Sequence, residues 1–218
     1  MIEACVWLDS YERFIRCLNF EEPDRVATWD LINDINIYRA IGGVGPNEEV
    51  IPKTFSKLGI DATRNGLSLP PTESRVWRSN RLNFLICDRE FTFRTIPEEG
   101  TTWIVERPFK TLDDLYEIGI EPLSKSEILE EAVPQMEKAV KAYKKYDVVY
   151  IFCGAVIFDQ AFWILGWELF IRALYYAPEQ IRKLLDKFTF VQEVLAKAWS
   201  EFDAPAYMYG DDIPISMG

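Results

Sequence analysis

The sequence predicts an α/β fold with about four parallel strands and one inserted antiparallel β-ribbon. Short β-branched and aromatic runs alternate with segments of helical periodicity, and this alternation is typical of a parallel sheet. Residues 75–109 instead contain several β-rich runs separated by turn residues, which indicates an antiparallel ribbon. The composition of the 218-residue chain, with 49% hydrophobic and 27% charged residues, is that of a folded globular protein.

Helix signals dominate the N-terminal part of the chain. Asp9 and Glu12 have the spacing of a capping box, which predicts a first helix that ends near Asn19. Residues 35–41 and 48–58 are expected to form two further helices, because glycines directly follow both segments as stop signals.

The predicted parallel strands are short and apolar. They are residues 25–31, 60–67, 147–154 and 204–209. The third strand opens an apolar run, residues 148–167, whose length is about that of a membrane-spanning helix. Asp159 near the middle of this run, and the glycines that interrupt it, favour a buried strand followed by a buried helix. We therefore expect no membrane span.

Further cap signals follow the predicted ribbon. Thr111 with Asp114, and Ser124 with Glu127, have the spacing of helix N-terminal caps. Pro134 is expected to kink the helix after Ser124 or to start a new one, because proline lacks the amide proton of a helix interior. A long amphipathic helix is expected to begin near residue 178, and the last strand follows it.

Charge and residue usage exclude several function classes. The formal net charge is −11, which argues against nucleic-acid binding, and the chain contains no histidine. It can therefore supply neither an imidazole base nor a histidine ligand to zinc, and we assign no metal ligands. The four cysteines form no C-x-x-C pair, and no signal peptide is apparent at the N-terminus. Reduced thiols and a cytoplasmic location are the expectation.

Polar residues follow each predicted strand, where barrel and open-sheet enzymes place their active sites. They are Asp30 and Asn33 after the first strand, Arg64 and Asn65 after the second, Asp159 after the third, and Asp211 and Asp212 after the fourth. We assign Asp30, Asp211 and Asp212 as candidate catalytic acids, because neighbouring carboxylates can raise one another's pKa. The other four are candidate substrate ligands.

Each candidate also has a purely structural explanation. Asp30 and Asp159 have positions from which they could cap the following helices, and Asn65 could occupy a left-handed turn. Of Asp211 and Asp212, only one is expected to face the interior, because adjacent residues on a strand point to opposite sides.

Four segments resemble the uroporphyrinogen decarboxylase-like family. They are RCLNFEEPDRV at 16–26, VERPFKTLDDL at 105–115, WILGWELFIRALYYAPEQIRKLLDKFT at 163–189 and YMYGDDIPISMG at 207–218. The family has a TIM (β/α)8 barrel fold. The resemblance therefore implies that residues 1–218 are a partial barrel, its N-terminal half, with residues 75–109 as the β-ribbon insertion.

The resemblance also implies a chemistry. The decarboxylases of this family carry an arginine-rich segment after the first strand, whereas this chain has Asp30 and Asp34 in TWDLINDINIYRA at 28–40. An acidic pocket would repel a polycarboxylate, so the chain is more similar to the branch of methyltransferases that work with a corrinoid (cobalamin-type) cofactor or a corrinoid protein. The implied partner is a small-molecule methyl donor or acceptor. Corrinoid and zinc are implied for the complete protein only, because the zinc ligands would lie beyond residue 218. This chain alone is expected to bind neither and to be inactive.

Two alternatives stay open. The chain could be a non-catalytic or split half-barrel subunit that pairs with another chain, or part of a decarboxylase acting on a porphyrinogen or a smaller acid. A half-barrel leaves sheet edges and an apolar face uncovered. We therefore expect a homo-oligomer or a complex with a complementary half-barrel rather than a stable monomer.

Overall fold

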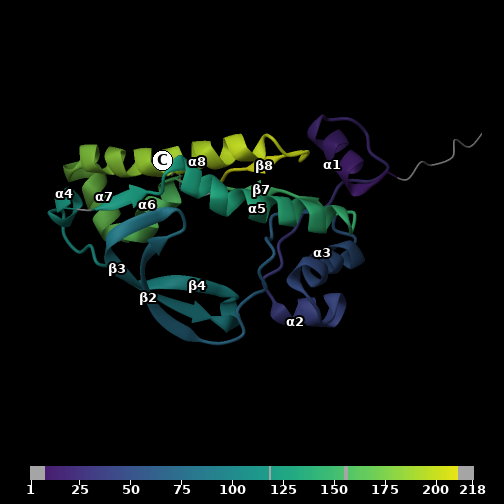
Figure 1. Ribbon diagram of the computed structural model, residues 1–218, viewed down its shortest axis with the longest axis horizontal. Helices are drawn as coiled ribbons and strands as arrows, with labels where there is room; N and C mark the ends of the chain where they lie inside the picture. Colours follow the sequence, from purple (N-terminus) through teal and green to yellow (C-terminus); the bar gives the residue numbers. More distant parts are fainter. Residues whose placement is uncertain (1–7, 118, 155–156, 211–218) are drawn as a thin grey trace, which may run out of the picture. The chain divides into compact units, whose positions relative to one another are not determined.

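The computed structural model describes residues 8–117, 119–154 and 157–210 (Figure 1). These residues divide into two compact units. The first unit comprises residues 8–72, 133–153 and 199–208, and the other described residues form the second unit. Helix α5 (Lys125–Lys144) and helix α8 (Pro178–Trp199) each contribute residues to both units.

Four helical elements near the N-terminus belong to the first unit: α1 (Ser10–Leu18), α2 (Ile35–Ile37), the π-helical turn η1 (Tyr38–Gly42) and α3 (Asn47–Leu58). Helix α1 begins with the predicted cap, because the Glu12 amide donates a 2.7 Å hydrogen bond to Asp9 Oδ1. Helix α3 ends at Gly59, which has a left-handed φ of 70°. Apolar side chains of η1, α3 and α5, together with Ile32 and Val148, form one core cluster, whose fully buried members include Tyr38, Ile51, Phe55 and Tyr143.

Parallel pairing in the first unit is confined to very short strands. β1 (Ala62–Thr63) pairs with β6 (Val149–Tyr150), and β7 (Phe152–Cys153) pairs with β8 (Tyr207–Met208). An isolated parallel bridge joins Trp29 to Ala62.

The expected sheet of about four parallel strands is therefore wrong, and with it the half-barrel fold. Within the described residues, the two named parallel pairs contain two residues per strand. Segment 25–31 does not form a strand, because side chains supply hydrogen bonds that a strand ladder would make. The Thr28 amide, for example, donates to Asp61 Oδ2 at 2.8 Å.

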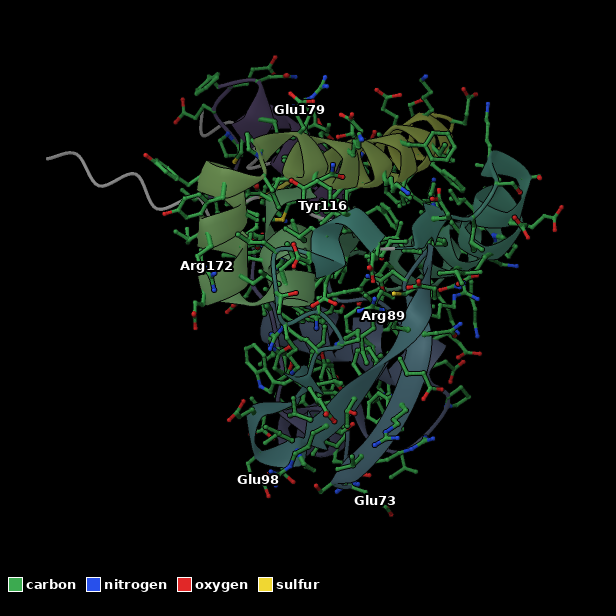
Figure 2. The ribbon with its side chains drawn as sticks, turned by 90° about the vertical axis from the view of Figure 1, so that its left-hand side faces the viewer. Glu73, Arg89, Glu98, Tyr116, Arg172 and Glu179 are labelled. Carbon is green, nitrogen blue, oxygen red and sulfur yellow. The ribbon has the colours of Figure 1, made fainter. Side chains whose placement is uncertain are left out.

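The second unit contains a twisted antiparallel ribbon at the position where the sequence predicts one. Its strands are β2 (Arg75–Leu82), β3 (Leu85–Ile96), β4 (Thr101–Glu106) and the short β5 (Ile120–Pro122), which pairs with the start of β3. The turn η2 (Pro97–Glu99) and Gly100, with a φ of 62°, connect β3 to β4. Figure 2 shows Glu73 and Glu98 together at one end of this ribbon, and Arg89 farther along it.

Helices form the rest of the second unit: α4 (Asp114–Glu117), α6 (Ile157–Leu165), α7 (Trp167–Tyr176) and most of α8. In Figure 1, α6 and α7 lie beside α8. Both predicted caps are present, since Asp114 accepts from the Thr111 amide and Glu127 accepts from the Ser124 amide, each at 2.8 Å. Helix α5 continues through Pro134, so the prediction of a new helix there is wrong.

The apolar run of residues 148–167 is divided among several elements. It forms β6 and β7 and then the nine-residue helix α6. In the part of the chain that the structure describes, no helix is long and apolar enough to cross a membrane. Cys17, Cys87 and Cys153 are free thiols.

Candidate functional site

Several of the predicted site residues gather at one edge of the first unit. Asp30 follows the bridge at Trp29, Arg64 and Asn65 follow β1, and Cys153 ends β7. Because the bridge and the strand pairs are all parallel, these residues lie at the carboxyl ends of their segments. We call Asp30, Arg64, Asn65 and Cys153 the carboxyl-end cluster.

Asn65 positions the cluster through its amide. Its Oδ1 atom accepts a 3.0 Å hydrogen bond from the Ile32 amide, and its Nδ2 atom donates to the Ile32 carbonyl oxygen at 3.0 Å. The Thr63 hydroxyl donates to the Asp30 carbonyl oxygen at 2.8 Å. Both ends of the Asn65 amide thus fix the segment that carries Asp30 and Asn33.

Arg64 and Cys153 form a polar contact that joins two strand ends through side chains. Arg64 Nη1 lies 3.4 Å from Cys153 Sγ and donates to the sulfur. Arg64 is exposed and Cys153 is half-buried. A guanidinium with further donors facing solvent can bind a carboxylate or phosphate, so the predicted ligand role of Arg64 stays a prediction. Sequence reasoning did not select Cys153, because its partner is 89 positions away.

Asp30 and Asn33 lie on the exposed side of the same edge. Asp30 Oδ1 accepts a 2.7 Å hydrogen bond from the Leu31 amide, so Asp30 does not cap helix α2. The cap is Asp34, whose Oδ1 accepts from the Asn36 amide at 2.8 Å. The Asp30 carboxylate is therefore available to a ligand at this edge.

The remaining candidates are Asp159, Asp211 and Asp212. Asp159 lies in the first turn of α6, in the second unit. Asp211 and Asp212 lie outside the described residues. Of the sequence-based candidates, Asp30, Asn33, Arg64 and Asn65 thus lie at this edge of the first unit.

A buried ion network, which sequence reasoning missed, lies at the opposite end of β1. Asp61 is 1% exposed and accepts from Arg13 Nη1 and Arg25 Nη1, each at 2.6 Å. Arg13 Nε also donates to Asp24 at 2.7 Å. The hydrogen bond from Arg13 holds the pKa of Asp24 well below its usual range. These charges satisfy one another inside the unit, so we assign the network to stability.

A cavity of about 330 Å³ lies in the first unit, against the residues that precede and form β6. Asp203 on its wall accepts a hydrogen bond from the Tyr11 hydroxyl at 3.5 Å and lies 3.5 Å from Lys144 Nζ. Burial raises the pKa of Tyr150, on the same wall, to about 12, so that phenol stays neutral. The lining of this cavity thus combines one lysine with several aspartates and a group of apolar side chains.

The donor set does not fit the zinc ion that the family resemblance implies. The chain contains no histidine. Among the described residues, no group of three or more cysteine or acidic side chains could hold a metal ion. The chain can offer no imidazole ligand to a corrinoid either, and we derive no catalytic step through either group.

Comparison of the chain with family models, with curated proteins and with solved structures gave no match.

Proposed function

We propose that this chain binds the small-molecule methyl donor or acceptor of a methyltransferase that works with a corrinoid cofactor or a corrinoid protein. The observation that carries the proposal is the carboxyl-end cluster, in which Arg64 and Asp30 present opposite charges at one edge of the first unit. The four segments that resemble the uroporphyrinogen decarboxylase-like methyltransferases support the corrinoid part of the proposal.

The chemistry of the cluster favours a small polar ligand with separated charges. Arg64 suits a carboxylate, because a guanidinium donates two parallel hydrogen bonds to such a group. Asp30 suits a cationic or proton-donating group of the same ligand. Asn65 holds the segment after β1, which carries Arg64, against the segment that carries Asp30, through its two hydrogen bonds to Ile32. The corrinoid chemistry itself would come from the rest of the enzyme or from a corrinoid protein, in the cytoplasm.

Equilibrium dialysis of the full chain tests this function with two probes, the methylated zwitterion trimethylglycine and hydroxocobalamin. We expect saturable binding of trimethylglycine, weakened about tenfold in Arg64→Gln through loss of a charged hydrogen bond. Arg16→Gln is the matched control, because Arg16 is an exposed arginine of the same unit, paired with Glu12 on α1. The proposal fails if trimethylglycine does not bind, or if both variants lose its binding equally. Hydroxocobalamin is the negative probe, because no corrinoid ligand is assigned to this chain.

A second candidate is a non-catalytic subunit that pairs with another chain. Helix α7 favours it, because Trp167, Ile171, Leu174 and Tyr175 are exposed at positions that share one helical face. Such a subunit would bind neither probe and would associate through this face.

A further inference from the structure

A cavity of about 320 Å³ lies in the second unit, against the ribbon and helix α6. Its walls come from β2, β3 and β4 on one side and from Gln160 and Trp163 of α6 on the other. Its volume is in the range of small-molecule sites, which are mostly apolar with a few convergent polar groups. This cavity is separate from the carboxyl-end cluster, so an inference about it does not depend on the proposed function.

Three aromatic rings give the cavity flat apolar walls. Trp77 of β2 stacks on Phe93, its direct partner on β3, with ring centroids 5.5 Å apart and an interplanar angle of 17°. Trp163 faces the cavity from α6, and its ring packs against that of Trp103 on β4, with centroids 5.5 Å apart. Rings held in this way offer a stacking surface for a planar ligand and lose little conformational freedom when it binds.

Arg81 supplies a positioned positive charge at the same cavity. Its Nε donates to the Asn83 carbonyl oxygen at 2.8 Å, and its Nη2 pairs with Glu131. These two contacts orient the guanidinium and leave the Nη1 donors for a ligand. Ser79 supports this arrangement, because its hydroxyl accepts from the Arg81 amide at 3.0 Å and therefore shapes the strand next to Arg81.

The charged residues of strand β2 are all arginines, although the chain as a whole is acidic. Strand β2 contains Arg75, Arg78 and Arg81 and no acidic residue, in a chain of net charge −11. Arg75 lies 5.4 Å from the centroid of the Trp77 ring. Arg75 and Arg81 therefore lie on either side of Trp77 along the strand, and Arg81, although paired with Glu131, has Nη1 donors that can bind an anion.

We propose that this cavity binds a planar aromatic or heteroaromatic ligand that carries one acidic group. The ring of the ligand stacks against Trp77 and Trp163, and its acidic group binds Arg81. The Gln160 amide, with two donors and one acceptor, selects among ring substituents at the wall formed by α6.

The test uses 2-naphthoate as the probe, with binding to the full chain measured by calorimetry. Two matched compounds separate the two halves of the proposal. 2-Naphthalenemethanol keeps the planar ring without the charge, and cyclohexanecarboxylate keeps the charge without the planar ring. We expect naphthoate to bind at least fivefold more tightly than either compound. Equal affinity for naphthoate and naphthalenemethanol would overturn the role of Arg81, and absence of naphthoate binding would overturn the site.

Two arginines of the same strand give matched variants. Arg81→Gln is expected to weaken naphthoate binding about fivefold and to leave naphthalenemethanol binding unchanged. Arg78→Gln removes the same charge three positions earlier in β2, at a side chain that does not line the cavity, and should change affinity less than twofold. Equal weakening by both variants would show a diffuse charge effect and would contradict the proposal. If Arg81→Gln does not fold, as judged by circular dichroism, the comparison of compounds on the unaltered chain decides.

Discussion

At the scale of single residues, Asp61 is the side chain on which the first unit depends most. Its two carboxylate oxygens accept from Arg13, Arg25 and Thr28, which come from helix α1 and from the segment before α2. The carboxylate is 1% exposed, so water cannot replace these partners. Loss of the charge would leave the guanidinium of Arg13 buried with only Asp24 as a counter-ion.

We therefore predict that Asp61→Asn lowers the free energy of unfolding by about 3 kcal/mol, as expected when one partner of a buried ion pair is removed. Urea denaturation followed by circular dichroism measures the change. Asp203→Asn is the matched control in the same unit. It removes an exposed charge that lies 3.5 Å from Lys144 and should cost less than about 0.5 kcal/mol. Equal effects of the two variants would contradict the structural role of Asp61.

The same carboxylate gives the stability a pH dependence of known sign. Burial raises the pKa of Asp61, but the hydrogen bonds from Arg25, Thr28 and Arg13 outweigh burial, so the pKa is lowered overall. A carboxylate whose pKa is lower in the folded state stabilises the fold at pH values above its unfolded-state pKa of about 4. This contribution is lost as the pH falls through the folded-state pKa. The stability difference between the unaltered chain and Asp61→Asn should thus be full at pH 6 and shrink below about pH 4.

At the scale of secondary-structure elements, Pro134 is an unfavourable residue in the interior of α5. It lacks an amide proton, so the carbonyl oxygen of Glu130 loses its intrahelical partner. Pro134 is exposed, so water can reach this part of the helix, and the remaining interactions of α5 hold it through the proline. The residue therefore costs stability without ending the helix.

Replacement by alanine should remove that cost. We predict that Pro134→Ala raises the free energy of unfolding by about 1–3 kcal/mol, the range in which proline and alanine differ inside a helix. Pro178→Ala is the control, because Pro178 is the first residue of α8, where no amide proton is needed. Thermal denaturation of both variants measures the difference. A lower melting temperature for Pro134→Ala than for Pro178→Ala would show that the proline is favourable in α5.

Caps and strands differ in how far the sequence could predict them. The three caps, at Asp9, Thr111 and Ser124, are correct because each depends on residues three positions apart. The parallel sheet is wrong because strand pairing depends on distant residues. Segment 25–31 has strand composition, yet Asp61, more than 30 positions away, satisfies part of its backbone instead. Such competition leaves no trace in the local pattern.

The candidate site shows the same division. The sequence selects Arg64 and Asn65 because they are polar residues that follow an apolar run, and they do lie at the edge that both share with Asp30. The pattern could not show that the Asn65 amide is used by Ile32, or that Cys153 contacts Arg64. The sequence pattern could not show the cavity between the ribbon and helix α6 either. Trp77 and Trp163 are far apart in the chain, and the role of each ring depends on tertiary contacts.

At the scale of the whole molecule, net charge and the apolar face of α7 oppose each other. Trp167, Ile171 and Tyr175 are 49%, 54% and 81% exposed and succeed one another at intervals of four residues on one side of the helix. Exposed apolar side chains grouped in this way favour association with a second copy of the chain. The net charge of −11 on each copy disfavours it. Salt screens the charge repulsion but leaves the apolar contact intact, since the Debye length falls from about 30 Å at 0.01 M to about 8 Å at 0.15 M.

We therefore predict that the chain self-associates through α7 and that association strengthens with ionic strength. Sedimentation velocity at one protein concentration, in 0.01 M and 0.15 M salt, should show a larger fraction of dimer at the higher salt concentration. Ile171→Glu places a charge in the apolar face and should return the chain to monomer at both concentrations. Arg172→Gln changes the net charge by the same amount at the adjacent exposed position, and it should leave the dimer fraction unchanged or only slightly lowered. A monomer at both salt concentrations, or equal loss of dimer in both variants, would show that this face of α7 does not mediate self-association.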